Sequence, residues 1–430
     1  MLHPVAERHQ RWNFFSFSVY TVFVLIAQAF VDPTTVLPVF VSHFTDSAVV
    51  IGSFVAIRNG CWAVPQLLTA GLIGRSPRVR PLAVLTTTVS RLSNAPLAII
   101  VLLFANSRGT LVLVSFFAFY ALYWLAAGTA GTPVPELSAR VVAPQRRGRL
   151  WGTGQFMGGI GAVAVGFLVR WLLGSHGPHF PTNWAIVFGA AAFFGAISSG
   201  GLAIVREGKH ATHQHRVPLV RYVVRAPALL AHNHAFARLV LTQVLFGLAA
   251  MGFPFYILLA REVLHISTGM VGIYLVAQTA GSTGGGLLCG YLADHFGNRT
   301  TIRLSMTAAL ATPLLGLLSF ALQSHGGVAQ LVLALAFLSL GTSVAWSASM
   351  AYPNLVLETV PLGERQTYVA LLNTIGGLAA LAPILGGVVL SVSNYPVLFG
   401  ITALPLIGGL AMSFRLHEPR RAPVLVPAER

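Results

Sequence analysis

Acidic residues, lysine and cysteine are scarce in this chain of 430 residues. It holds 11 Asp and Glu residues against 27 Lys and Arg residues, and charged residues make up 9% of the chain. Cys61 and Cys289 lie in apolar runs, which argues against a disulfide framework. The sole lysine, Lys209, follows Gly208 but is followed by His210 and lacks the earlier glycine of a phosphate-binding loop, and no HExxH zinc motif occurs. With no obvious site for acid–base catalysis either, we expect no enzyme, cofactor or metal centre.

Apolar residues are abundant instead. Hydrophobic residues make up 55% of the chain, and the mean hydropathy is +0.74. A water-soluble fold cannot cover so much apolar surface with so few charges. A helix that crosses a bilayer needs roughly 20 residues, and twelve runs approach or exceed that length. We therefore predict an all-α integral membrane protein with transmembrane helices at about 13–42, 47–73, 81–105, 110–134, 150–173, 184–205, 236–260, 268–292, 301–323, 327–351, 366–391 and 394–414.

The basic residues are distributed unevenly between the two ends of these runs. The formal net charge is +16, yet most basic residues fall in the two tails and in the loops after even-numbered runs. Only Arg108 and Arg261 fall in loops on the other side. This asymmetry follows the positive-inside rule and places both termini in the cytoplasm of a multi-pass plasma-membrane protein. Because the charges form no basic domain, we expect no nucleic-acid partner.

The two halves of the chain repeat one pattern of prolines, glycines and a loop arginine. A shift of 218 residues superposes four pairs: Pro135 and Pro353, Arg147 and Arg365, Gly158 and Gly376, and Gly159 and Gly377. A shift of 220 superposes Gly52 and Gly272. Such residues have specific backbone or charge roles, so the match indicates a duplication. We predict an N-terminal six-helix bundle over 1–205, a cytoplasmic linker over 206–235, and a C-terminal six-helix bundle and tail over 236–430.

The segment GYLADHFGNR at 290–299 resembles the G-x-L-x-D-x-x-G-x-R signature of the major facilitator superfamily (MFS), in the loop after helix 8. The resemblance implies two pseudo-symmetric six-helix bundles that carry a small molecule across the lipid bilayer by alternating access, and we expect a monomer. The first-half copy of the signature departs from the pattern, since Arg75 stands opposite Asp294. In the family the signature acid closes the inner gate. Asp294 is therefore expected near Arg147 and Arg149, at the start of helix 5.

The same resemblance implies ion pairs beside this gate. Two acids at helix ends are expected to pair with signature arginines of their own halves: Glu136 with Arg78 or Arg80, and Glu358 with Arg299 or Arg303. The alternative is ordinary helix-end charges in water, where a pair contributes about 0–1 kcal/mol. The predicted gate and signature-loop residues are Gly290, Asp294, Gly297, Arg299, Arg303, Glu136, Glu358, Arg147 and Arg365.

Charges inside the predicted spans are costly in a bilayer and usually mark function or a structural pair. Asp32 is the only acid well inside a span, and Arg58 lies at a similar depth in the next span. Arg91 lies about one helical turn deeper in the third. Asp32 is either a proton site that interacts with Arg58 or Arg91 during transport, a permanent lock with Arg58, or a cap for a kink at Pro33.

Polar and aromatic residues in the spans are candidates for contact with a substrate. They suit an amphipathic or neutral solute, although many such residues pack in helix interfaces instead. The candidates are Tyr120, Tyr123, Trp124, Gln155, Gln243, Tyr256, Gln278, Trp346, Asn354 and Asn373.

The favoured function is a secondary active transporter that exports a small amphipathic or hydrophobic compound in exchange for protons. Family exporters often carry a proline within a glycine-rich pattern in helix 5, and the segment GTGQFMGGIGAVAVG at 152–166 lacks that proline. The departure weakens an antiporter assignment. The alternatives are an uncoupled facilitator, an uptake transporter for a small neutral solute, and a polytopic lipid-modifying enzyme.

Overall fold

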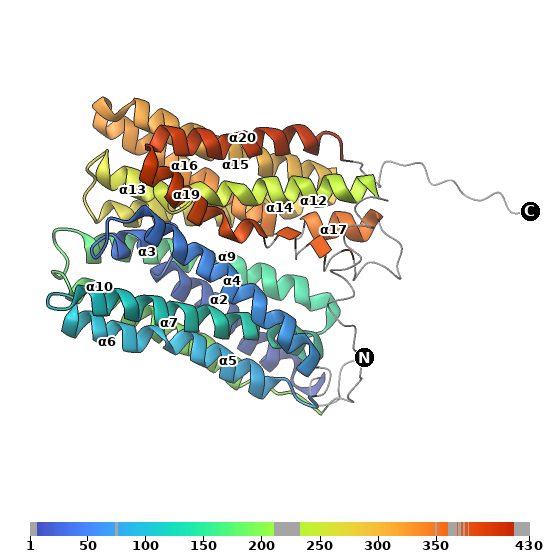
Figure 1. The fold of residues 1–430 in the computed structure, drawn as a ribbon. Helices are drawn as coiled ribbons and strands as arrows, with labels where there is room; N and C mark the ends of the chain where they lie inside the picture. The colour runs from blue at the N-terminus through green and yellow to red at the C-terminus, as the bar shows by residue number, and fades with distance from the viewer. Residues whose placement is uncertain are drawn as a thin grey trace, which may run out of the picture.

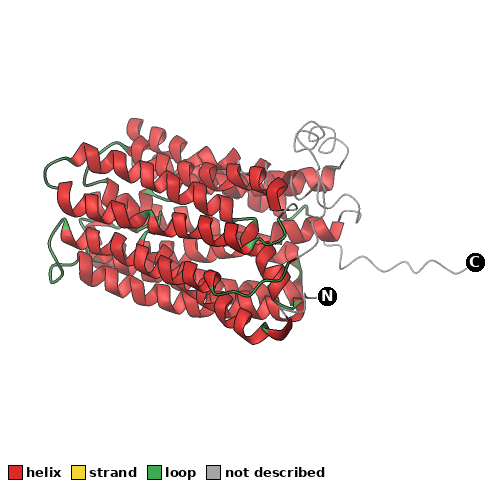
Figure 2. Cartoon of the chain, turned by 90° about the horizontal axis from the view of Figure 1, so that it is seen from below, coloured by secondary structure: helices red, strands yellow, loops and turns green. Residues whose placement is uncertain are grey.

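A computed structural model describes residues 7–73, 76–209, 233–348, 351–359, 368, 371–372, 375–376 and 378–416. Within these residues the secondary structure is helical, without strands (Figure 2). The helices of the first half are α2 (Gln10–Phe30), α3 (Val36–Val41), α4 (Ala48–Ile73), α5 (Arg80–Leu92), α6 (Asn94–Phe104), α7 (Gly109–Ala130), α8 (Pro133–Val141), α9 (Pro144–Leu173) and α10 (Thr182–Ala203).

The second half contains α-helices and three short 3-10 helices, labelled η. They are α12 (His234–Gly247), η1 (Leu248–Gly252), α13 (Phe255–Glu262), α14 (Met270–Phe296), α15 (Asn298–Ala321), η2 (Gln323–His325), α16 (Gly326–Ala348), α17 (Ala351–Thr359), η3 (Leu378–Leu381), α19 (Ala382–Val392) and α20 (Tyr395–Ser413).

The predicted twelve-span membrane fold is confirmed, and each predicted span contains one of these helices or a broken series of them. Nine helical segments of the described chain are long and apolar enough to cross a membrane, and shorter apolar stretches occur in α4 and α19. Large apolar side chains such as Leu103, Phe193 and Leu331 are each 63% exposed on the outside of the molecule. An exposed apolar surface of this kind fits a lipid environment, in which burial of apolar groups between helices is not required.

Three spans that the sequence predicted as continuous are interrupted. Span 13–42 breaks between α2 and α3, where Pro33 lacks the amide hydrogen that would continue the helix. Span 236–260 passes through η1 and restarts at α13 directly after Pro254. Span 81–105 divides at Ser93 into α5 and α6. The breaks free backbone groups inside the molecule, and irregular backbone at membrane depth usually lies beside a cavity.

The two halves have matching internal packing (Figure 1). In the first half α2 packs against α9 and α10, and in the second half α12 packs against η3 and α20. Helix α4 packs against α7 as α14 packs against α16. Between the halves, α9 contacts α14 and α4 contacts α19. These pairs are related by the same duplication that the sequence predicted, so the contact between the halves is itself pseudo-symmetric.

Helix α2 begins and α20 ends at the same end of the molecule, which we call the terminal end (Figure 1). At the opposite end the backbones of the two halves touch. A Cβ atom added to Gly52 of α4 would lie 2.3 Å from the Pro383 carbonyl oxygen, and one added to Gly272 of α14 would lie 2.3 Å from the Gly166 carbonyl oxygen. Gly52 and Gly272 are equivalent in the repeat, so both copies use a glycine for this close approach.

The same helices separate toward the terminal end. On α14, a Cβ atom added to Gly284, Gly286 or Gly290 would meet nothing within 4 Å, and the same holds for Gly148 and Gly152 on α9. Among the described residues, the glycine contacts between the halves therefore lie at the opposite end, and the glycines of α9 and α14 toward the terminal end make none.

A polar contact reinforces the closed end. The guanidinium of Arg261, at the end of α13, donates to the Ser42 hydroxyl and, at 3.4 Å, to the Val39 carbonyl oxygen of the first half. Beside it, the Tyr395 hydroxyl donates to Glu262 Oε2 at 2.6 Å. These bonds fix α13 both to the first half and to α20.

Candidate functional site

A cavity of about 250 Å³ lies between the halves. Helices α2, α3, α4, α6, α7, α9 and α10 and the segment before α3 line it from the first half, and Phe253 after η1 and helices α14 and α16 line it from the second. Most of its wall is apolar, with Leu37, Phe116, Phe188, Leu275 and Leu340 among the lining residues. Its polar lining residues include Asp32, Arg58, Asn94, Tyr120, Trp124, Gln155, Gln278 and Thr283.

Asp32 occupies the break between α2 and α3 and closes a tight turn there. Its Oδ1 atom accepts from the Thr34 and Thr35 amides at 2.8 and 2.9 Å and from their hydroxyls at 2.6 and 2.9 Å. Its main-chain carbonyl accepts from the amides of Val36 and Leu37. An aspartate that accepts from the amide two residues ahead forms an Asx turn, which restarts the chain after a helix break.

The second oxygen of Asp32 faces the other half. Asp32 Oδ2 accepts from Gln278 Nε2 of α14 at 3.2 Å, and the Thr34 hydroxyl oxygen lies 2.7 Å from Gln278 Oε1. Because the Thr34 hydroxyl has one proton, it donates to Asp32 or to Gln278 at any moment, but not to both. Asp32, Thr34 and Gln278 thus form one hydrogen-bonded group that joins the two halves across the cavity.

The Asp32–Arg58 lock is not formed in this conformation. Across the described part of the chain the ion pairs are Arg140 with Glu136 and Arg140 with Glu207, and neither involves Asp32 or Arg58. Instead the Arg58 guanidinium carbon lies 4.9 Å from the centre of the Trp124 ring, in a cation–π contact. Asp32 accepts from donors of its own turn and from Gln278, and Arg58, which lines the cavity, has the Trp124 ring as its contact.

Arg91 lies behind the cavity wall and lines no part of the cavity. Its side chain is 5% exposed, donates to the Tyr123 hydroxyl and to Ser90 Oγ at 3.3 Å, and lies 5.1 Å from the centre of the Tyr123 ring. It packs directly on Gly195 of α10, where an added Cβ atom would lie 2.7 Å from the Arg91 Cβ atom. Since Tyr123 itself lines the cavity, Arg91 contributes positive charge from one layer further out.

Three buried polar atoms on cavity-lining residues have no hydrogen-bond partner among the described residues: the Tyr120 hydroxyl, the Trp124 indole nitrogen and the Thr283 hydroxyl. Buried polar groups are nearly always satisfied in folded proteins, so unsatisfied groups on a cavity wall are candidates for contact with a ligand. Tyr120 and Trp124 are 7% and 8% exposed, and their rings pack edge to face with centroids 6.2 Å apart.

The structure separates the sequence candidates into two groups. Tyr120, Tyr123, Trp124, Gln155 and Gln278 line the cavity. Tyr256 and Gln243 do not: Tyr256 is 1% exposed and stacks on Phe399 with centroids 4.5 Å apart, and Gln243 packs against Gly376. Asn354 lies on α17, away from this cavity. The side chains of Trp346 and Asn373 lie outside the described residues.

Sequence reasoning overlooked Thr34, Asn94 and Thr283. Small polar residues are common in membrane helices, and nothing in the sequence distinguished Asn94 or Thr283 from the others. Thr34 alone carried a usable signal, because it follows Asp32 by two residues in an Asx-turn arrangement.

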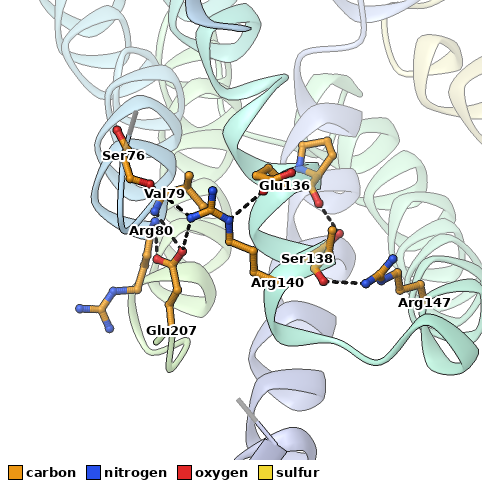
Figure 3. A network of polar contacts seen from close by, with 10 residues as sticks. Ser76, Val79, Arg80, Glu136, Ser138, Arg140, Arg147 and Glu207 are labelled. Atoms are coloured by element: carbon orange, nitrogen blue, oxygen red, sulfur yellow. Dashed lines mark hydrogen bonds and ion pairs between the residues drawn. The ribbon is translucent and has the colours of Figure 1, made fainter. Parts of the chain in front are cut away.

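At the terminal end, the predicted pairing of Glu136 with Arg78 or Arg80 is wrong (Figure 3). Glu136 Oε1 accepts from Arg140 Nε at 2.8 Å, one turn along α8. The Arg80 guanidinium donates to the Val205 carbonyl oxygen at 2.8 Å. Arg140 lies four residues after Glu136 on the same helix, so it is closer to Glu136 than the predicted partners Arg78 and Arg80 are.

Glu207, rather than Glu136, contacts the segment that contains Arg80. Its two oxygens accept from the amides of Val79 and Arg80 at 3.0 and 2.9 Å, and Oε1 lies 3.4 Å from Arg140 Nη1 (Figure 3). Glu207 therefore caps the first turn of α5, where a carboxylate is favoured by the helix dipole, and links it to α8.

The signature loop is also free of the predicted contact with α9. Asp294 is exposed at the end of α14, and Gly297, with φ of 85°, makes the sharp connection to α15 that favours glycine. Arg147 donates to the carbonyl oxygens of Ala139 and Val142 at the end of α8, at 2.6 and 3.0 Å. Arg299 and Arg303 donate to the Phe414 carbonyl oxygen at the end of α20.

The predicted gate is not assembled in this conformation, in agreement with the separation of the halves at the terminal end. The Glu358 side chain and Arg365 lie outside the described residues.

The helical architecture, the lipid-compatible surface and the cavity shared by two half-bundles are those of a multi-pass membrane protein with a site between its halves. Residues 239–430 match the sequence model of the Major Facilitator Superfamily, and none of the curated proteins matches the chain. The sequence match covers the second half of the chain, and both halves together share their fold with the solved transporter structures described next.

Three solved structures are similar over nearly the whole chain. A mutant of the nucleoside transporter NupG is 12% identical with a TM-score of 0.68, covering 94% of this chain and 100% of its own. A D-xylose–proton symporter is 14% identical with a TM-score of 0.67, covering 97% and 99%. A bacterial homologue of the human lysosomal transporter Spinster, inward-facing and unoccupied, is 14% identical with a TM-score of 0.60, covering 95% of each chain. At these identities the likeness concerns the fold.

Proposed function

We propose that this protein is a secondary active transporter that moves a small amphipathic compound through the central cavity, with Asp32 as the proton-coupling residue. The observation that carries the proposal is the hydrogen-bonded group of Asp32, Thr34 and Gln278. It contains the one acid of the cavity lining and joins the two halves of the protein. A change in its protonation therefore acts on the contact that moves during alternating access.

The arrangement of donors identifies the oxygen that takes the proton. Four donors surround Asp32 Oδ1, whereas Oδ2 has the Gln278 amide as its donor among the described residues. A proton on Oδ2 turns that oxygen into a donor, and rotation of the Gln278 amide then presents its Oε1 as the acceptor. The rotated Nε2 donates to the Thr34 hydroxyl oxygen, which keeps its own proton for Asp32 Oδ1. The protonated state thus supplies a proton to every contact of the group, whereas the ionised state leaves one of the two Thr34 contacts without one, so the two states differ in their hydrogen bonds between the halves.

The direction of transport has two candidates. Export in exchange for protons is the direction that the sequence favoured. Uptake together with protons is the second, and the fold it shares with a D-xylose–proton symporter supports it. With the terminal end taken as cytoplasmic from the distribution of basic residues, the observed conformation is inward-open. Both directions pass through this state.

An Asp32→Asn variant tests the coupling role. Asparagine is as good a turn and cap residue as aspartate, so the break between α2 and α3 should survive while the titrating group is lost. In proteoliposomes, a screen of small amphipathic compounds identifies one that the wild type moves. We expect Asp32→Asn to retain exchange of that compound across the membrane and to lose its accumulation against a gradient driven by a pH difference.

Asp46→Asn is the matched control, since it removes an acid from the exposed loop at the opposite end, and it should behave as the wild type. Loss of exchange and accumulation together in a folded Asp32→Asn protein would mean that Asp32 acts only as a structural cap. Unchanged pH-driven accumulation would exclude it as the coupling residue.

A further inference from the structure

Among the residues that the structure describes, few of those lining the cavity are charged or titratable. They are Asp32 and Arg58, together with the hydroxyls of Tyr120 and Tyr123, and the guanidinium of Arg91 lies behind Tyr123. The lining residues of α9, α14 and α16 are uncharged. Asp32 already accepts five hydrogen bonds, so the negative charge of the cavity is directed at its own turn and at Gln278. The positive charge of Arg58 is not matched in this way.

Arg58, Trp124 and Tyr120 are contiguous on one side of the cavity. The Arg58 guanidinium lies over the Trp124 ring, and the Trp124 ring packs against Tyr120. Arg58 makes no hydrogen bond or ion pair with the rest of the described chain, and the Tyr120 hydroxyl and Trp124 indole nitrogen have no partner there. Guanidinium and indole groups can only donate hydrogen bonds, and a tyrosine hydroxyl can donate as well. This side of the cavity therefore offers donors and one cation to whatever occupies it.

We infer that the transported compound carries a carboxylate, which binds to Arg58, Tyr120 and Trp124, while its apolar part packs on the wall formed by Phe116, Phe188 and Leu275. A carboxylate supplies acceptor atoms only and matches a guanidinium in charge and geometry. When Asp32 is protonated, a single negative charge also balances Arg58, the one cation among the described lining residues, whereas a phosphate dianion would leave an excess. This inference rests on the proposed function and specifies its substrate class.

The charge balance couples the carboxylate to the proton. With Asp32 ionised, the lining residues carry no net formal charge. With Asp32 protonated, the Arg58 charge is uncompensated inside the membrane, where a lone cation is costly. Protonation of Asp32 therefore strengthens binding of an anion, and by thermodynamic reciprocity the anion strengthens binding of the proton. Ligands that favour each other's binding travel together, so of the two directions above this coupling selects proton-linked symport.

The test is a binding measurement on purified full-length protein with three probes of the same shape and different charge. They are 2-naphthoate, the neutral 2-naphthamide and the cationic 2-naphthylmethylammonium, with naphthyl phosphate added as a dianion, and binding is measured by titration calorimetry. In the wild type we expect 2-naphthoate to bind most tightly. Arg58→Gln should weaken 2-naphthoate by about tenfold or more, the equivalent of one charge-assisted hydrogen bond. It should leave 2-naphthamide unchanged, and Arg58→Lys should recover part of the loss.

Arg108→Gln, which removes an arginine at the opposite end outside the cavity, is the matched control and should bind as the wild type. Lowering the pH, within the range in which the probe stays ionised, should tighten 2-naphthoate binding in the wild type and not in Asp32→Asn.

Preference for the amide, the ammonium or the phosphate would overturn the carboxylate assignment while leaving the cavity and its role in transport intact. Failure of 2-naphthoate to bind at millimolar concentration, or equal binding to wild type and Arg58→Gln, would also overturn it. Failure of the proposed function is distinguished by the proteoliposome experiment, which does not depend on these probes.

Discussion

At the scale of single residues, Glu207 and Glu136 share one partner and differ in burial. Both contact Arg140, but the Glu207 side chain is 1% exposed and the Glu136 side chain 41% exposed. Glu207 also caps α5 through two backbone amides. Around Arg140, Glu207 is thus a buried helix cap, and Glu136 is an exposed ion-pair partner on the same helix as the arginine.

Replacing Glu207 with alanine should destabilise the protein by roughly 2 kcal/mol or more, because two amides at the start of α5 and one guanidinium lose a buried acceptor. Glu136→Ala, which removes an exposed i,i+4 pair to the same arginine, should cost about 0.5 kcal/mol or less. Thermal unfolding in detergent, followed by circular dichroism, measures both. Equal shifts of the unfolding temperature in the two variants would mean that the Glu207 cap stabilises the protein no more than the exposed Glu136 pair does.

At the scale of helices, α14 contacts the other half along only part of its length. A Cβ atom at Gly272 would lie 2.3 Å from the Gly166 carbonyl oxygen and 2.4 Å from the Arg170 amide nitrogen, whereas one at Gly284 would meet nothing within 4 Å. Both positions are glycines on the same helix. They therefore give a matched pair for testing the closure at the opposite end.

Gly272→Ala should disfavour the closed opposite end, because the methyl group cannot fit without moving α9 and α14 apart. A cysteine placed at Thr279 in the cavity, in a background with Cys61 and Cys289 replaced by alanine, should then react faster with a membrane-impermeant maleimide added from that side. If the clash destabilises the closed state by about 1.4 kcal/mol, the labelling rate should increase about tenfold.

Gly284→Ala should leave the labelling rate of the Thr279 cysteine at the wild-type value. Equal rates in both variants would show that the glycine contact does not control closure.

The sequence predicted the helices well because hydropathy alone decides which segments enter a bilayer. The repeat was equally informative: Gly52 and Gly272, matched by a shift of 220, both lie where the halves touch. A kink at Pro33 capped by Asp32 was one of the alternatives that the sequence offered, whereas the breaks at Ser93 and before Pro254 were not predicted, because an apolar run gives no sign of them. Pairing partners were also missed, as for Glu136, because the nearest arginine in space depends on how the loops pack.

Within the cavity, residue type was a partial guide. Asp32 and Arg58 stand out as charges within apolar runs, and both line the cavity. Tyr256 and Gln278 look alike as candidates, yet Tyr256 packs in the core and Gln278 bonds to Asp32. The two residues differ in which side of their helix faces the cavity. When a helix is apolar all round, its sequence does not show which side faces the cavity.

At the scale of the whole molecule, the conformation itself could not be read from the sequence. Under the proposed alternating-access mechanism, one sequence specifies both an inward-open and an outward-open state, and the two differ by a few kcal/mol at most. The structure has the halves touching at the opposite end and apart at the terminal end. The proposed mechanism requires that these two regions change in opposite senses, under the control of Asp32.

Distances between pairs of spin labels, measured by double electron–electron resonance in lipid nanodiscs, test that requirement directly. One pair of labels, at Gly152 and Gly290, joins α9 to α14 at the terminal end. The other pair, at Ser175 and Ser267, lies at the opposite end, in the segments that follow α9 and precede α14. The account predicts that any shift lengthening one distance shortens the other, and that pH changes the balance in the wild type but not in Asp32→Asn. Distances that vary independently, or an Asp32→Asn protein that responds to pH as the wild type does, would contradict it.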